Sequence, residues 1–216
     1  MRTSRIASTF AMIASVGVLI TAARPLASRV PPPASRVVKR ETWPAPNAVL
    51  QSGMLSFTGH STLGDFVGTT TAVSGGVSGN AELANARGWI EAPVTTLSTG
   101  NGLRDHDLRG TMDVAKYPTM RFELAGVTVG SLPGLSDTVI GGLRGALTIH
   151  GVTRDVVILA TLIKAADTID VSGAFPVDLA DYKVDGLTRL FGTLRVQRKI
   201  DVRFHVRFEA TPHTPT

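Results

Sequence analysis

The sequence has 216 residues, 43% of them hydrophobic and 18% charged, which suits one globular domain with tails. It contains no cysteine, and this excludes disulfide bonds and thiolate metal sites. The formal net charge of +5 comes from basic residues before residue 49, so the remainder of the chain lacks the basic surface of a nucleic-acid-binding domain, and we expect no nucleic-acid partner.

The first 23 residues have the pattern of an export signal. Arg2 and Arg5 precede an apolar run over residues 6–20, and the small residues Thr21, Ala22 and Ala23 follow. These are the basic, hydrophobic and cleavage regions of a signal peptide. We therefore expect a periplasmic or secreted protein. A retained membrane anchor is the alternative, but polar residues interrupt a run that is short for a span of about 20 residues.

Residues 24–48 are rich in proline and arginine. Proline fixes the backbone and removes a hydrogen-bond donor, so this segment is expected to be an extended linker. Its basic side chains could touch an anionic membrane surface, although a solvated spacer is the simpler interpretation.

From residue 49 to 211 the hydrophobic pattern has a period of two. It is clearest near the end, where Ile200, Val202, Phe204, Val206 and Phe208 alternate with polar or charged residues. Similar runs occupy residues 54–58, 66–77, 87–94, 120–124, 139–148, 152–163 and 168–178. Strands with one apolar face, about eight in number, predict a single all-β domain built as a closed antiparallel barrel. Residues 212–216 would be a tail.

One charged segment interrupts the strands, and we expect a short helix near residues 101–116. Asn101 can begin it, and Tyr117-Pro118 can end it because proline disfavours a helical residue before it. His150-Gly151 predicts a tight turn between two strands.

No arrangement of residues points to catalysis or to a metal. The five histidines lack the spacing of a metal site, and no serine stands in a Gly-x-Ser-x-Gly elbow. Asp105-His106-Asp107 could exchange protons, but a guanidinium and a carboxylate where a loop meets a helix more often satisfy backbone groups. We therefore expect Arg104 and Asp105 to be structural.

Several short phrases occur in a characteristic order. They are Phe57-x-x-His60, Gly64-Asp65-Phe66-x-Gly68, Thr99-Gly100, Arg104-Asp105, Tyr117-Pro118 and the segment from Gly145 to Val156. Over roughly residues 52–210 the chain resembles the YceI-like family of lipocalin-like, polyisoprenoid-binding periplasmic proteins. The resemblance implies a barrel that encloses a long isoprenoid, such as an isoprenoid quinone or a polyprenyl lipid, without a covalent cofactor.

The expected function is therefore non-catalytic binding of an isoprenoid for carriage, storage or stress protection. The side chains expected to line the cavity are Phe57, Phe66, Trp89, Met120, Phe122, Leu124, Leu147, Ile149 and Phe204, with His60, Arg104 and Asp105 at its mouth. The alternative is a structural or adaptor barrel with a filled core and no lipid. The sequence also leaves open that a second copy of the chain is a partner, in a homodimer.

Overall fold

The computed structural model describes residues 47–79, 83–130, 137–185, 188–189 and 194–211. The predicted signal peptide (1–23), nearly all of the predicted linker (24–48) and the tail (212–216) lie outside these residues. None of the helices within the described ranges is long and apolar enough to cross a membrane.

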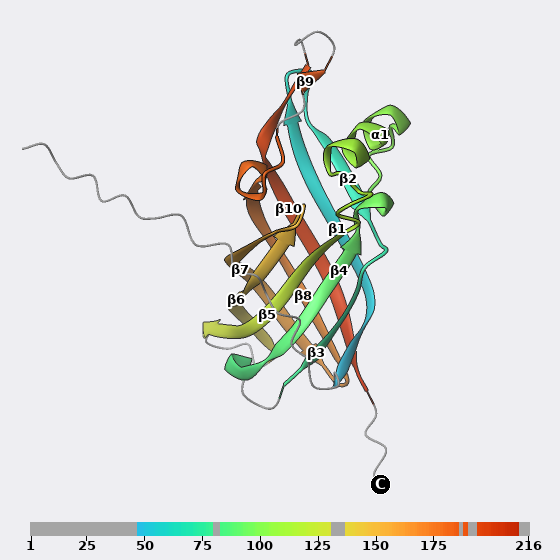
Figure 1. Cartoon of the computed structure of the whole chain (residues 1–216). Helices are drawn as coiled ribbons and strands as arrows, with labels where there is room; N and C mark the ends of the chain where they lie inside the picture. The colour runs from blue at the N-terminus through green and yellow to red at the C-terminus, as the bar shows by residue number, and fades with distance from the viewer. Residues whose placement is uncertain (1–46, 80–82, 131–136, 186–187, 190–193, 212–216) are drawn as a thin grey trace, which may run out of the picture. The chain divides into compact units, whose positions relative to one another are not determined.

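The described residues form ten antiparallel strands and one α-helix (Figure 1). The strands are β1 (Ala48–Ser61), β2 (Phe66–Thr70), β3 (Ser74–Ser78), β4 (Arg87–Pro93), β5 (Thr119–Gly130), β6 (Thr138–Ile149), β7 (Val152–Ala165), β8 (Thr168–Asp178), β9 (Thr188–Arg189) and β10 (Leu194–Ala210). Short 3₁₀ helices cover Leu83–Asn85, Val94–Thr96 and Leu179–Tyr182.

The sheet closes because β1 pairs with β10 as well as with β2 and β3. β2 and β3 follow one another along the same edge of β1, and β9 pairs only with the start of β10, which leaves a ring of eight strand positions. The predicted closed antiparallel barrel of about eight strands is therefore confirmed.

The sequence predicts one strand over residues 66–77, but the structure divides it into β2 and β3. Between them the backbone bonds locally. The hydroxyl of Thr70 accepts a hydrogen bond from the amide of Ala72 at 3.1 Å, and the amide of Val73 donates to the carbonyl of Thr71 at 2.9 Å. A threonine side chain that captures a nearby amide competes with strand pairing.

The helix α1 spans Gly102–Thr111, and the side chain of Asn101 caps its start as predicted. It ends earlier than expected. Asp113 adopts a left-handed conformation with φ of 44°, and the amide of Val114 donates to the carbonyl of Arg109. This pattern terminates a helix by satisfying its last carbonyls. The short helix predicted near residues 101–116 is therefore confirmed, with its last helical residue at Thr111 and turns over residues 112–116.

The turn between β6 and β7 agrees with the prediction. His150 and Gly151 have φ values of 50° and 71°, the two successive left-handed residues that a tight two-residue hairpin requires. The ring of His150 lies 4.5 Å from that of Tyr117, which follows α1. The hairpin therefore packs against the segment that connects α1 to β5.

Aromatic rings inside the barrel pack on glycines of neighbouring strands. Phe57 lies directly opposite Gly68 and covers it, and Phe66 covers Gly59 in the same strand pair. Phe204 and Gly173 form an equivalent pair between β10 and β8. A side chain at any of these glycines would overlap the ring. The glycines therefore leave room for the rings to pack against the neighbouring strand.

Two groups of buried side chains form the hydrophobic core. One includes Leu124, Val127, Leu143, Ile158, Val206 and Phe208. The other lies beneath α1 and includes Val94, Leu97, Met112, Leu147, Ile149, Val177, Tyr182 and Val184. The second group surrounds the site described next.

Candidate ligand-binding site

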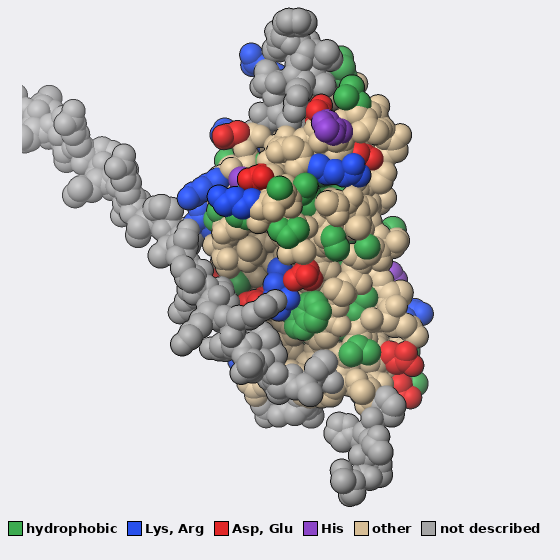
Figure 2. Space-filling view, turned by 45° about the vertical axis from the view of Figure 1, so that its right-hand side comes forward, with side chains coloured by type: hydrophobic (Ala, Val, Ile, Leu, Met, Phe, Trp, Pro, Cys, Tyr) green, Lys and Arg blue, Asp and Glu red, His purple; other side chains and the backbone are tan. Residues whose placement is uncertain are grey.

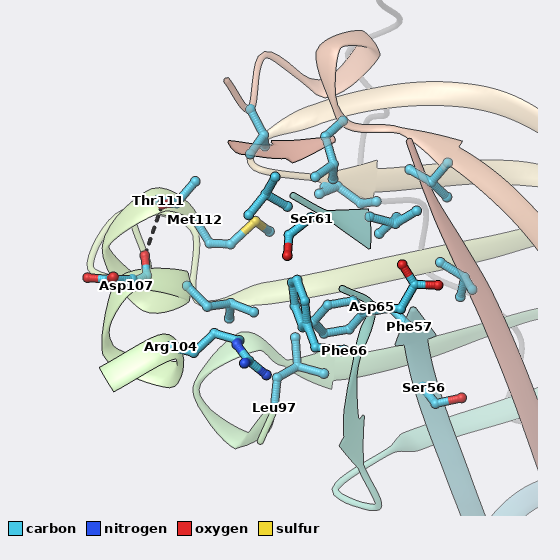
Figure 3. A pocket seen from close by; sticks show the side chains of 18 of the residues that line it. Ser56, Phe57, Ser61, Asp65, Phe66, Leu97, Arg104, Asp107, Thr111 and Met112 are labelled. Atoms are coloured by element: carbon cyan, nitrogen blue, oxygen red, sulfur yellow. Dashed lines mark hydrogen bonds between the residues drawn. The ribbon is translucent and has the colours of Figure 1, made fainter. Parts of the chain in front are cut away.

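A cavity of about 360 Å³ opens at the end of the barrel that carries α1 (Figure 3). Its wall comes from β1, β2, β5, β6, β8 and β10, and α1 and the β1–β2 turn form its rim. Most of the lining side chains are hydrophobic. This volume falls in the range of about 300–1,000 Å³ that is usual for small-molecule sites.

A second cavity of about 90 Å³ lies deeper in the barrel. Leu55, Met120, Leu147 and Phe175 line both cavities, so these four side chains separate them. An apolar chain that enters from the α1 end would therefore meet a hydrophobic floor at this level.

Two phenylalanines form an aromatic wall near the mouth. Phe57 on β1 and Phe66 on β2 have ring centroids 6.1 Å apart with perpendicular planes, a favourable edge-to-face arrangement. The guanidinium carbon of Arg104 lies 4.5 Å from the centroid of the Phe66 ring. Arg104 thus extends from α1 toward Phe66 and stacks on its ring, as Figure 3 shows.

One face of α1 forms part of the cavity. Arg104, Leu108 and Met112 follow one another at intervals of four residues, and all three line it. Residues four apart share a helix face, so this spacing could have added Leu108 and Met112 to the predicted Arg104.

The rim carries two exposed leucines. Leu63 at the β1–β2 turn and Leu103 in the first turn of α1 are 79% and 75% exposed, and both border the cavity. Neither was predicted. Both stand outside the period-two pattern of the strands, which was the basis for choosing lining residues.

Asp105 fixes the loop before α1 and does not line the cavity. It is 7% exposed, and its carboxylate accepts hydrogen bonds from the amide of Thr99 at 2.8 Å, the hydroxyl of Thr99 at 2.6 Å and the hydroxyl of Ser98 at 3.1 Å. The bonds from Thr99 in particular lower the pKa of Asp105, because they stabilise the ionised form. Asp105 therefore links the first turn of α1 to the loop that precedes it.

His60 lies on the outer wall beside the mouth. Its Nδ1 is 2.9 Å from a carboxylate oxygen of Asp65, and its Nε2 is 3.3 Å from one of Asp201 on β10. The hydrogen bond with Asp65, followed by that with Asp201, raises the pKa of His60 above its ordinary value. His60 does not line the cavity, but at its mouth it ties the turn that carries Leu63 to the barrel wall.

Of the remaining predicted residues, Phe57, Phe66, Met120, Leu147, Ile149 and Arg104 line the larger cavity. Phe122 and Phe204 line the smaller one, and Leu124 packs in the core group farther from α1. The interior orientation expected for these strands therefore agrees with the structure, but the depth at which each side chain lies could not be read from alternation.

Trp89 was predicted to line the cavity, but in the structure it lies on the outer wall. Its neighbour Ile90 lines the smaller cavity, and successive strand residues point to opposite faces. The guanidinium of Arg121 stacks 4.8 Å from the Trp89 ring and pairs with Glu91 at 3.1 Å. The sequence already indicated this outward orientation, because Trp89 has the same strand parity as the charged residues Arg87 and Glu91. The outer surface in Figure 2 likewise mixes hydrophobic, basic and acidic side chains.

The site offers shape and hydrophobic surface rather than reactive groups. Within the described ranges, no group of three His, Cys, Asp or Glu side chains could hold a metal ion. The lining combines hydrophobic side chains with a few polar ones near the rim, among them Ser61, Asn101 and Thr111. This arrangement can bind an apolar molecule with a polar end.

Comparison with known proteins identifies the family. The model of the YceI-like domain matches residues 48–208. Among solved structures, a polyisoprenoid binding domain from Saccharophagus degradans, implicated in plant cell wall breakdown, is 19% identical with a TM-score of 0.65, covering 77% of this chain and 99% of its own.

Two further structures share the fold. Burkholderia cenocepacia BcnA is 17% identical with a TM-score of 0.59, covering 72% of this chain and 95% of its own. The Campylobacter jejuni YCEI protein is 20% identical with a TM-score of 0.53, covering 67% and 85%. No curated protein matches the chain.

Proposed function

Because this chain belongs to the YceI-like family, we propose that it is an exported, non-catalytic protein that encloses the hydrocarbon chain of an isoprenoid for carriage, storage or stress protection. The observation that carries the proposal is the apolar cavity of about 360 Å³ at the α1 end of the barrel. The structural likeness to a polyisoprenoid binding domain supports the choice of ligand class.

Hydrophobic burial supplies the driving force for such binding. Each buried methylene contributes about 0.8 kcal/mol, and part of this is lost because a flexible chain becomes ordered. The rival hypothesis, a structural barrel with a filled core, would leave no such cavity. The volume beneath α1 therefore favours a binding protein over a purely structural barrel.

Export completes the proposal. A signal peptide over residues 1–23 would deliver the barrel to the periplasm or the exterior, and residues 24–48 would remain as a linker. N-terminal sequencing of the mature protein should begin near Arg24 or within the linker. An intact Met1 on membrane-bound protein would contradict cleavage and support a retained anchor.

The direct test is mass spectrometry of an organic extract of the natively produced protein. We expect an isoprenoid from the wild type and little or none from Met120→Trp. Met120 lines both cavities, and the indole ring, which is larger than the methionine side chain, would fill the space between them. Leu159→Trp is the matched control, since Leu159 is 69% exposed on the outer wall. A lipid-free wild type from a host that makes isoprenoids would refute the proposal.

A further inference from the structure

Arg104 is the one basic side chain among the described residues that line the larger cavity. Its guanidinium lies over the ring of Phe66 at 4.5 Å, and it makes no ion pair or side-chain hydrogen bond with the part of the chain that the structure describes. By contrast, the guanidinium of Arg121 is paired with two glutamates. Stacking uses the face of a guanidinium and leaves its N–H donors available.

The acidic residues of the cavity wall are placed differently. Asp65 is bound to His60 at 2.9 Å. Asp107 lies one turn along α1, and Figure 3 shows its carboxylate directed away from the aromatic wall, whereas the side chain of Arg104 extends toward Phe66 and Leu97. Arg104 is therefore the charged group that the helix presents to the mouth.

From this geometry we propose that Arg104 binds an anionic oxygen head group, a phosphate or a carboxylate, whose hydrocarbon chain extends into the cavity toward Phe175. This rests on the proposed function and narrows it, since it favours a polyprenyl phosphate over an isoprenoid quinone. A guanidinium can donate two parallel hydrogen bonds to an oxyanion, and such charge-assisted bonds are roughly twice as strong as neutral ones. A quinone carbonyl or an alcohol offers neither the charge nor the paired acceptors.

The hydrophobic surroundings reinforce this preference. Phe66 and Leu97, which line the cavity, lie beside the guanidinium (Figure 3). Hydrophobic neighbours lower the local dielectric and strengthen an ionic hydrogen bond. An anion at the mouth would also leave the chain free to lie along the aromatic wall.

The test compares farnesyl phosphate with farnesol, which have the same C15 chain and differ in the phosphate. Isothermal titration calorimetry on the mature protein should show tighter binding of farnesyl phosphate. Arg104→Gln should weaken farnesyl phosphate binding about ten- to hundredfold, and it should change farnesol binding by no more than about twofold. Inorganic phosphate alone should not bind at the same concentrations, because it lacks the chain.

Arg109→Gln is the matched control, with the same charge change on the same helix. Arg109 is exposed, does not line the cavity, and donates to the carbonyl of Thr95. It should leave both affinities unchanged. Arg104→Lys should give an intermediate loss for farnesyl phosphate, because it keeps the charge without the planar fork.

The outcomes separate the head-group inference from the proposed function. Equal weakening of both ligands by Arg104→Gln would show that Arg104 only supports the wall through Phe66, and would overturn the inference. Equal affinity of the wild type for both ligands would also overturn it and leave the isoprenoid cavity standing. No binding of either ligand would refute the proposed function itself. If Arg104→Gln does not fold, Arg104→Lys decides, and unchanged farnesyl phosphate affinity in it would count against the inference.

Discussion

The loop before α1 should depend on Asp105 for its stability. The carboxylate is nearly buried and accepts three hydrogen bonds, one from the amide of Thr99 and two from the hydroxyls of Thr99 and Ser98. Asp105→Ala would remove all three hydrogen bonds and leave the amide of Thr99 without its partner. The two hydroxyls can turn to water, so the amide should account for most of the loss.

The magnitude follows from these contacts. A hydrogen bond to a charged group contributes about 1.5–3 kcal/mol, and an unsatisfied buried donor costs about 1–3 kcal/mol. We therefore expect Asp105→Ala to lower the free energy of unfolding by about 3 kcal/mol. In a domain of this size each kcal/mol shifts the Tm by about 2–4 °C, so the Tm should fall by about 6–12 °C. Asp105→Asn keeps an acceptor and should lose about half as much.

Thermal and urea unfolding monitored by circular dichroism would measure the effect, with His106→Ala as the control because His106 is exposed on the same helix. The pKa of Asp105 is lowered in the folded protein, so its stabilisation is complete above the ordinary value of 3.8 and is lost as the pH falls through the folded value. The difference between wild type and Asp105→Ala should therefore shrink at acid pH. Equal Tm values at pH 7 would refute this reasoning.

Three further predictions concern the mouth and the cavity. Because the pKa of His60 is raised in the folded protein, the stabilisation from its ion pairs with Asp65 and Asp201 is complete below pH 6.5 and is lost as the pH rises through the pKa of the folded protein. An NMR titration should therefore give a pKa above 6.5 for His60, and Asp65→Asn should lower it. Gly68→Ala should reduce stability by about 1–3 kcal/mol because its methyl group would overlap the Phe57 ring, whereas Gly102→Ala, which meets no neighbour, should not. Phe175→Leu should join the two cavities and shift bound lipid toward longer chains by mass spectrometry, and an unchanged chain-length distribution would contradict this.

The barrel could be predicted because its signals are local. Strand alternation places Phe122, Phe204 and Leu147 inside, and the His150-Gly151 turn fixes one hairpin. The same rule, applied to Trp89, would have placed it outside. The large aromatic side chain was given more weight than its parity with charged neighbours, and parity was the better guide.

The position of each residue along the barrel axis could not be predicted in this way. Phe66 and Leu124 both face inward, but one lines the larger cavity and the other packs in the core group away from α1. Depth depends on the register between strands, and bulges in β1 and β5 shift that register. Alternation repeats every two residues and carries no information about such offsets.

The location of the cavity follows from where the barrel carries side chains and where it carries glycine. In the strand pair β1–β2, Phe57 and Phe66 pack against glycines of the facing strand, and both rings form part of the cavity wall. Deeper in the barrel, the ring centroids of Phe175 and Phe204 are 6.4 Å apart, and both rings line the smaller cavity. At the α1 end, Leu108 and Met112 line the larger cavity, and Arg104 lies at its mouth. A hydrocarbon chain would thus enter the cavity beside Arg104, the one basic side chain that lines it among the residues the structure describes.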